Sequence, residues 1–182
     1  TTGPRMKVRF FGGFNYTDAM LTSPDLAKQA YAGGVPMGAD LVGTGAAPHF
    51  ITWAMQDSNS APLQRVQVVK VTSGGEAVYD AACSGGAVPD ENHRCPDNGA
   101  SVDIATCETS PGTGAGELKA LWTDPDFDPA QRATYYVRVL ENPTCRWSTW
   151  EANRNGTPPN PDLPTTIQER AYTSPIWYIP PA

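Results

Sequence analysis

The sequence has 182 residues, of which 40% are apolar, with 17 glycines, 18 prolines and a formal net charge of −6. This length suits one domain with a hydrophobic core, the apolar content argues against disorder, and the glycine and proline content excludes a helix-rich protein. The acidic balance, without a cluster of Lys and Arg, argues against nucleic acid and anionic membranes as partners. No apolar run is long enough to insert into a membrane.

The first residues, Thr1 to Arg5, contain neither an initiator methionine nor a signal segment, so we expect a chain cut from a longer protein or a processed form. Lys7 to Phe11 then predicts a strand. A cap residue followed by proline, Ser23-Pro24, predicts a helix that Gly33-Gly34 ends. Residues Val35 to Leu41 are expected to be extended.

Several strands are predicted in the middle of the chain. His49 to Met55 and Leu63 to Val71 are rich in apolar residues, and Leu63 to Val71 also alternates in character. A turn at Ser73 to Gly75 indicates that Glu76 to Cys83 pairs back as a hairpin. Ala100 to Cys107 is expected to return as another strand after a polar loop. Strands at short intervals predict a mainly β protein, an antiparallel β-sandwich-like domain with a few short helices and long Gly/Pro-rich loops.

The four cysteines lack the paired spacing of a zinc site, so an even number in an acidic, loop-rich chain favours disulfides and an oxidising compartment. They are Cys83, Cys95, Cys107 and Cys145. Three pairings are possible. We favour Cys83–Cys95, which closes a local loop between two strands, and Cys107–Cys145, which ties residues 134–150 to a preceding strand.

Asp124, Asp126 and Asp128 resemble the opening of a calcium loop. However, Pro129 occupies the position that requires glycine, and Tyr135 the position of the bidentate glutamate. A turn, with Asp128 capping a single helical turn up to Gln131, explains these aspartates better. We therefore expect no metal and no cofactor in this chain.

The strongest strand signal lies in residues 134–150, which we call the hub. Tyr135, Val137 and Val139 are predicted on one face, and the intervening residues on the other. Asn142-Pro143 ends the strand because proline has no N–H for a ladder. Ser148 to Glu151 has the spacing of a capping box, so a short helix is expected to start there.

The C-terminal part begins with a proline-rich connector at residues 156–164. The aromatic segment Ile176 to Ile179 would expose much apolar surface if it were free, so we expect residues 165–182 to pack on a β-sandwich-like domain formed by residues 1–164.

The hub also carries the candidate binding residues, Arg138, Glu141, Arg146 and Trp147. Arginine suits planar anions, and tryptophan can stack on a sugar ring or a guanidinium. The alternative is structural: an ordinary Arg138–Glu141 ion pair and a core tryptophan at position 147. No nucleophile elbow and no phosphate-binding glycine loop occurs, so no catalytic residue is predicted.

These residues lie within a resemblance that extends over nearly the whole chain. It is carried by the segments GPRMKVRFFGGF, VPMGADL, APLQRVQVVKV, CPDNGASVDIATC, WTDPDFDPAQRATYYVRVLENPTCRWSTW and LPTTIQERAYTSPIWY. The chain resembles the carboxy-terminal region of domain-of-unknown-function family three-six-zero-four.

The resemblance implies a longer, exported bacterial protein. Its amino-terminal domain is similar to metal-dependent phosphoesterases of the polymerase-and-histidinol-phosphatase superfamily. The present chain would then be an accessory domain of a periplasmic or secreted hydrolase, with the missing catalytic domain as its partner and no metal ligand of its own. The alternative is a stand-alone module that binds a sugar or another small anionic ligand.

Overall fold

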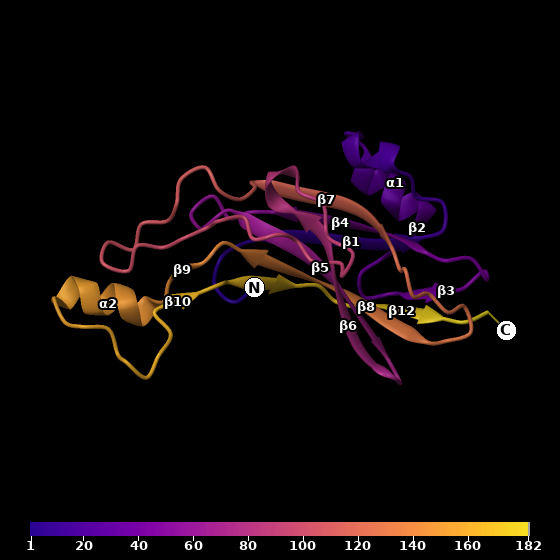
Figure 1. The fold of residues 1–182 in the computed structure, drawn as a ribbon. Helices are drawn as coiled ribbons and strands as arrows, with labels where there is room; N and C mark the ends of the chain where they lie inside the picture. Colours follow the sequence, from indigo (N-terminus) through magenta and orange to yellow (C-terminus); the bar gives the residue numbers. More distant parts are fainter. Residues whose placement is uncertain (182) are drawn as a thin grey trace.

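The computed structural model describes residues 1–181, whose two larger β-sheets pack face to face (Figure 1). The first sheet has the strand order β2-β1-β4-β7, and the second has the order β3-β12-β8-β5-β6, with β11 also paired to β8. The first sheet consists of β1 (Lys7–Gly13), β2 (Gly34–Pro36), β4 (His49–Met55) and β7 (Glu117–Thr123). The second consists of β3 (Asp40–Val42), β5 (Leu63–Thr72), β6 (Gly75–Cys83), β8 (Ala133–Glu141), β11 (Arg170–Tyr172) and β12 (Ile176–Ile179). The prediction of a mainly β, sandwich-like domain is confirmed.

The pairing is antiparallel except between β12 and β3, which run parallel. The alternation predicted for the hub strand is confirmed, since Tyr135, Val137 and Val139 are fully buried between the sheets. From the first sheet, Phe10 and Phe50 face them, with the ring centroids of Phe50 and Tyr135 4.5 Å apart. The aromatic segment β12 contributes Ile176 and Tyr178 to the same core.

A second, smaller cluster covers one end of the outer face of the first sheet. The 3-10 helix η1 (Asp18–Thr22) and α1 (Leu26–Gly33) pack there (Figure 1). The cluster consists of Phe11, Tyr16, Leu26, Ala30 and Ile51. No helix of residues 1–181 covers the other end of that face, and this asymmetry leaves room for the groove described below.

The helix predicted to begin at Ser23-Pro24 is present, although its first residue is Leu26. The Ser23 hydroxyl accepts the N–H of Asp25, so the capping serine organises the turn ahead of the helix. The helix ends at Gly33, as predicted. Gly34 follows, where a Cβ atom would lie 2.2 Å from the carbonyl oxygen of Gly12. Glycine therefore lets β2 approach β1 closely.

The strand predicted from Ala100 to Cys107 is wrong. This segment contains only a bridge between Val102 and Thr109. The Asp103 carboxylate accepts the N–H of Ala105 at 2.8 Å, and the Asp103 carbonyl accepts the N–H of Cys107. An aspartate that satisfies nearby backbone groups in this way favours a tight turn over a ladder. A further 3-10 turn, η2 (Ser84–Gly86), follows β6 in the same loop region.

Two predicted helix starts also need correction. Residues 128–131 form a hydrogen-bonded turn without a helix, in which the Asp128 carboxylate accepts the N–H of Ala130. The helix after the hub strand is α2 (Trp147–Asn155), and Arg146, not Ser148, is at its N-cap. Ser148 therefore lies inside the first turn, and its predicted capping box does not form. Gly156 ends the helix in the left-handed conformation.

Both favoured disulfides are confirmed, Cys83–Cys95 and Cys107–Cys145. The second differs from expectation in what it joins, because Cys107 belongs to the turn-rich loop. It ties that loop to the short strand β9 (Thr144–Cys145) at the foot of α2. Their loops of 12 and 38 residues contribute about 3 and about 4 kcal/mol to stability in the chain-entropy model.

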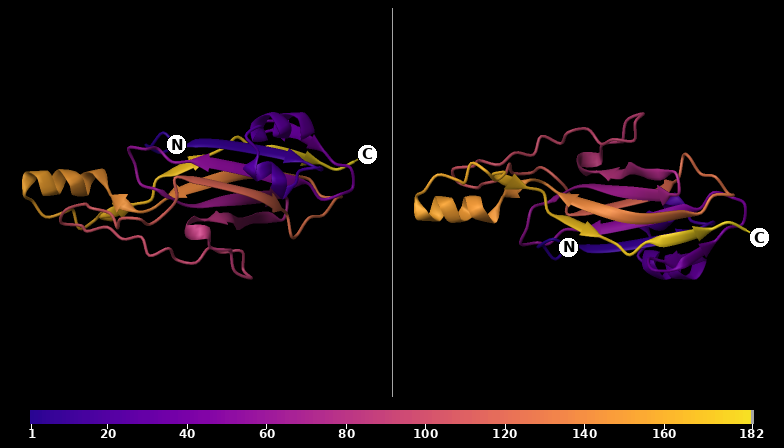
Figure 2. Two further views of the ribbon diagram at one scale, coloured as in Figure 1. Left: turned by 90° about the horizontal axis from the view of Figure 1, so that it is seen from above. Right: turned by 90° about the horizontal axis from the view of Figure 1, so that it is seen from below.

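Helix α2 forms an arm that projects beyond the sandwich. Figure 2 shows it at the end of the molecule opposite to α1. β9 pairs with β10 (Thr166–Ile167) at the base of the arm. The carbonyl of Thr165 accepts the N–H of Arg146 at 2.9 Å and the hydroxyl of Thr149 at 2.8 Å. Within residues 1–181, no helix combines the length and the apolar character needed to cross a membrane.

Candidate functional site

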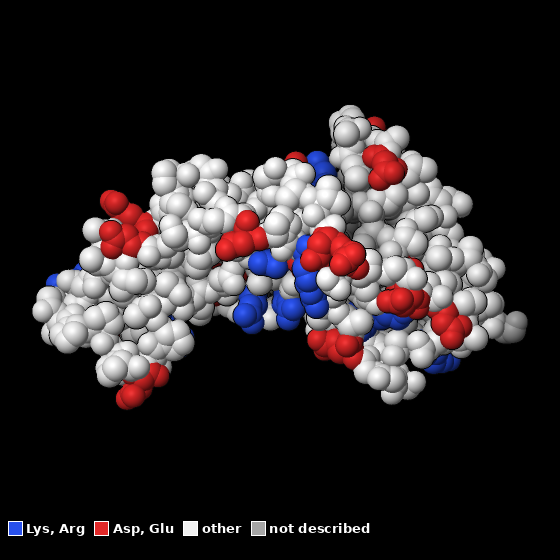
Figure 3. Space-filling view, in the orientation of Figure 1, with Lys and Arg blue, Asp and Glu red and all other residues white. Residues whose placement is uncertain are grey.

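Arg138 lies in a polar row on the outer face of the second sheet. Tyr172, Arg138, Gln67 and Asp80 are direct neighbours across β11, β8, β5 and β6. Arg138 Nε–H donates to Gln67 Oε1 at 2.7 Å, and Gln67 Nε2–H donates to Asp80 Oδ1 at 2.6 Å. Figure 3 shows basic side chains gathered between the arm and the β5–β6 hairpin, flanked by acidic ones. Arg138 is therefore fixed within a hydrogen-bonded face of the sheet.

Glu141 ends the same strand but is completely buried. The Ser60 hydroxyl donates to Glu141 Oε2 at 2.6 Å, while Oε1 has no partner within residues 1–181. The pKa of Glu141 is raised to about 7, mainly by burial; the Ser60 hydrogen bond lowers this pKa, and the carboxylates of Glu169 and Asp57 raise it. The Arg138–Glu141 ion pair weighed from the sequence does not form, because the two side chains have different partners.

Arg146 lines a hollow of about 350 Å³ at the base of the arm. The same hollow is lined by Thr2, by Gln168 to Arg170 and by Tyr172. The Thr2 N–H donates to the carbonyl of Arg170 at 2.9 Å, which fixes the first residues at this place. The Nε of Arg146 is buried and has no hydrogen-bond partner in the described chain. We call this feature the basal hollow.

Trp147 is not a core residue, since 68% of its surface is exposed. Trp150, one turn further along α2, is 42% exposed, and the guanidinium of Arg154 lies 5.9 Å from its ring centroid. Only Thr149 and Ala152 of this helix are buried. The arm therefore presents two tryptophans to its surroundings.

The four candidate residues are thus not brought into one cavity. Arg138 belongs to the sheet face, Glu141 to the interior, Arg146 to the basal hollow and Trp147 to the surface of α2. Within the described residues, no group of three or more His, Cys, Asp or Glu side chains is arranged to hold a metal ion.

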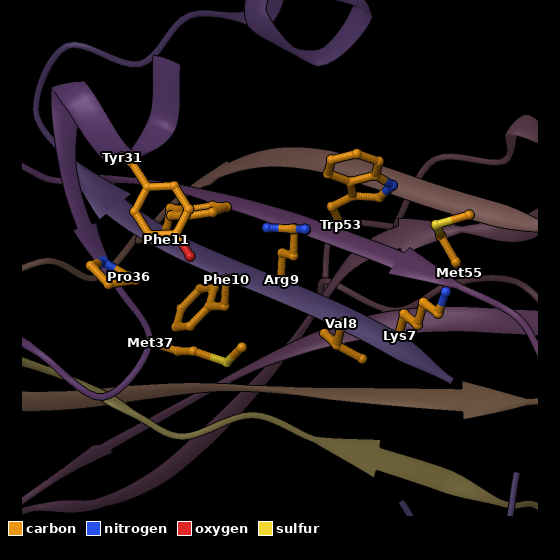
Figure 4. Close-up of a pocket in the computed structure, with 10 residues that line it drawn as sticks. All are labelled: Lys7, Val8, Arg9, Phe10, Phe11, Tyr31, Pro36, Met37, Trp53 and Met55. Carbon is orange, nitrogen blue, oxygen red and sulfur yellow. The ribbon is translucent and has the colours of Figure 1, made fainter. Parts of the chain in front are cut away.

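A larger hollow, of about 670 Å³, lies over β1 on the uncovered end of the first sheet (Figure 4). We call it the β1 groove. At one end, Phe11, Tyr31, Pro36 and Met37 form an apolar pocket wall. Tyr31 stands on Phe11 with ring centroids 4.9 Å apart and planes at 80°, and 55% of its surface is exposed.

The remainder of the β1 groove is basic. Lys7 and Arg9 are two residues apart on β1, so they point to the same face, about 7 Å apart. Neither has a side-chain hydrogen bond or ion pair to another described residue. None of the residues lining the groove is acidic.

Trp53 fixes the position of Arg9. Arg9, Trp53 and Lys119 are neighbours across β1, β4 and β7. The Arg9 guanidinium lies 5.7 Å and the Lys119 Nζ 4.6 Å from the Trp53 ring centroid. The ring itself is held by Nε1–H, which donates to Glu117 Oε1 at 2.6 Å. An indole between two cations stabilises both.

Sequence reasoning missed the β1 groove because its residues come from separate segments. The available signal was the alternation of basic and apolar residues in 7–10, which places Lys7 and Arg9 on one face of a strand. The contact of Arg9 with Trp53 depends on the register Arg9↔Trp53, which only the structure supplies.

No curated protein and no solved structure matches this chain. One family model does match, and it spans residues 1–180. Its description is protein of unknown function (DUF3604), and its extent agrees with the resemblance seen in the hub and its flanking segments. The chain therefore belongs to the DUF3604 family.

Proposed function

We propose that this chain is an accessory domain of a longer, exported DUF3604 protein, and that it docks on a metal-dependent hydrolase domain and shapes its substrate cleft. One observation carries the proposal: Thr2 and Arg146 line the same basal hollow. A domain joined ahead of Thr1 would therefore begin beside Arg146 and the foot of the arm. Docking at this place would put Arg146, which lines the basal hollow, at the domain boundary.

The exposed tryptophans of α2 support the same role. Trp147 and Trp150 lie on a helix that makes few contacts with its own sandwich. Tryptophan and arginine are the residues most enriched at the centres of protein interfaces, because they bury a large surface and form hydrogen bonds. The arm therefore has the composition of a docking surface.

Export is part of this proposal. Two disulfides fit a protein that matures in an oxidising compartment, such as the periplasm or the medium. The substrate-cleft role rests on the hollow and the arm, and it does not depend on which of these two compartments applies.

The second candidate function is a stand-alone module for a sugar or an anionic ligand, built from Arg138, Arg146 and Trp147. These three residues do not share a cavity. Trp147 has an exposed ring, but its neighbours in the adjoining shallow hollows come only from α2 and the connector that follows it. The arrangement therefore favours the docking role over a binding site at the hub.

The experiment compares three proteins: this chain, the full-length parent, and the parent with Arg146→Ala. Each is assayed for bound metal and for hydrolysis of phosphate, sulfate and carboxylate esters with added divalent ions. We expect metal and turnover only in the parent, and a much larger loss of turnover than of thermal stability in Arg146→Ala.

Arg132→Ala is the matched control, because Arg132 is an exposed arginine just before β8 that lies outside both the basal hollow and the arm. It should leave turnover near the parent value. Stoichiometric metal and turnover in the isolated chain would contradict the proposal. So would equal proportional losses of turnover and stability in Arg146→Ala.

A further inference from the structure

We propose that the β1 groove is a binding site for a small organic anion whose charged group, a carboxylate, sulfate or phosphate, is attached to a flat apolar ring. The proposal is independent of the docking role, because the groove lies over the first sheet and shares no residue with the basal hollow. Its volume of about 670 Å³ is within the range of sites for small molecules.

The preference for an anion follows from the charges that line the groove. Lys7 and Arg9 face it from one strand, and no carboxylate does. Because the whole chain has a formal net charge of −6, a surface with two cations and no acid is a local exception. An anion placed between the two side chains would receive charge-assisted hydrogen bonds from both.

The Trp53 stack restrains Arg9, one of the two cations of the groove. Arg9 lies 5.7 Å from the centroid of an indole that is itself hydrogen-bonded to Glu117. An arginine held on a ring loses less conformational freedom when it binds a ligand than a free surface arginine does. Since Arg9 and Lys119 are both placed over this indole, Trp53 serves to position the cation, and the ring of the ligand must bind elsewhere.

The place for that ring is the apolar end. Tyr31 is more than half exposed and stands edge-on to Phe11, and Met37 lies opposite them in the groove (Figure 4). Met37 is anchored by its N–H, which donates to the carbonyl of Phe10 at 2.9 Å. A flat ring between Tyr31 and Met37 would gain aromatic and thioether contacts. The ring and the charge of the ligand are thereby assigned to opposite ends.

The test is a calorimetric titration of the chain with phenyl phosphate, phenyl sulfate and benzoate. Benzyl alcohol, which has no charge, and inorganic sulfate, which has no ring, are the controls. We expect saturable binding of at least one aryl anion with a Kd on the order of 1 mM or tighter. Both controls should bind at least about tenfold more weakly, because each lacks either the charged group or the ring that the groove is proposed to recognise.

Variants locate the binding. Arg9→Gln should weaken the binding of the aryl anion about tenfold. Tyr31→Ala should weaken the binding of the aryl anion severalfold without affecting the binding of inorganic sulfate. Arg154→Gln is the matched control, since Arg154 also lies over a tryptophan, at 5.9 Å, but on the arm. If Arg9→Gln lowers the melting temperature, Lys7→Gln replaces it.

Three results would each overturn the proposal: the absence of saturable binding for all three aryl anions, equal binding of benzyl alcohol, or unchanged affinity in the folded cation variant. Among the three anions, the one that binds tightest identifies the charged group.

Discussion

Lys70 Nζ lies 2.6 Å from Asp124 Oδ2 inside the sandwich, and both side chains are almost completely buried. The Tyr135 hydroxyl donates to the same oxygen at 2.7 Å, and Lys70 also donates to the carbonyl of Asp126. Burial raises the pKa of Tyr135, and the neighbouring Asp124 raises it further, so the phenol remains a donor. An aspartate that resembled a calcium ligand in the sequence thus serves as the counter-ion of a buried lysine.

Asp124→Asn should be strongly destabilising, because it leaves the Lys70 charge buried without its counter-ion. We expect a loss of roughly 3–5 kcal/mol in the free energy of unfolding, measured by urea denaturation. Glu117→Gln is the control, since it removes a more exposed ion pair with Lys119 and should cost less than about 1 kcal/mol. Similar losses in both variants would contradict this account of the buried pair.

Glu141 should make stability depend on pH. Its pKa is about 7 in the folded chain against 4.5 as the ordinary value, so folding favours the protonated form. This contribution to stability is complete below pH 4.5 and is lost as the pH rises through 7. The difference between these two pKa values corresponds to a contribution of at most about 3 kcal/mol to the free energy of unfolding.

Glu141→Gln tests this directly, because glutamine stays neutral. The difference in unfolding free energy between the variant and the wild type should favour the variant increasingly between pH 5 and pH 8, by about 1–3 kcal/mol in total. Glu151→Gln, at an exposed position on α2, should show no such trend. A difference that does not change with pH would show that Glu141 is ionised throughout.

Truncation to alanine should reduce stability strongly at one tryptophan and hardly at all at another. Trp122 packs between the sheets against Phe50, Tyr79 and Tyr135. Trp122→Ala should therefore cost roughly 3–5 kcal/mol. Trp147→Ala removes an exposed ring and should change stability by less than about 0.5 kcal/mol. Thermal and urea unfolding measure both. A large loss in Trp147→Ala would show that the arm packs on the sandwich.

The disulfide Cys107–Cys145 should protect the long loop from proteases. Beside it, the hydrogen bond from Asn153 Nδ2 to the carbonyl of Ile104, at 2.8 Å, joins this loop to the arm. Replacing both cysteines with serine should speed cleavage within residues 100–116 and lower stability by about 4 kcal/mol.

The pair Cys83–Cys95 offers the comparison for that experiment. Its loop is shorter, and the Cys95 N–H also donates to Asp80 Oδ2 at 2.7 Å. Replacing this pair with serines should cost about 3 kcal/mol and leave residues 100–116 as resistant as in the wild type. Equal protease sensitivity of the two double variants would contradict the assignment.

Local patterns in the sequence predicted the hub strand and the point where it ends. The alternation around Val137 gives a buried strand, and Pro143 ends the strand, because both effects act within a few residues. The segment around Asp103 was mispredicted because the hydrogen bonds of one side chain outweighed the strand propensity of its neighbours.

The candidate site could not be predicted in the same way. Arg138 and Arg146 are close in sequence, but the chain leaves the sheet after Glu141 and enters the arm, which separates them. Arg9 and Trp53 are far apart in sequence, but the register of two strands makes them neighbours. Sites assembled from tertiary pairing need the register, which no single segment encodes.

The parallel pairing of β12 with β3 has a consequence for how the protein is made. β12 pairs with both β3 and β8, and β11 pairs with β8. These edges of β3 and β8 therefore find their partners only when residues 170–179 are available. Contacts between such distant parts of a chain form slowly, and the half-built sheet has an open edge in the meantime. The second sheet of the nascent protein would therefore stay incomplete until residues 170–179 have been synthesised and have paired with β8 and β3.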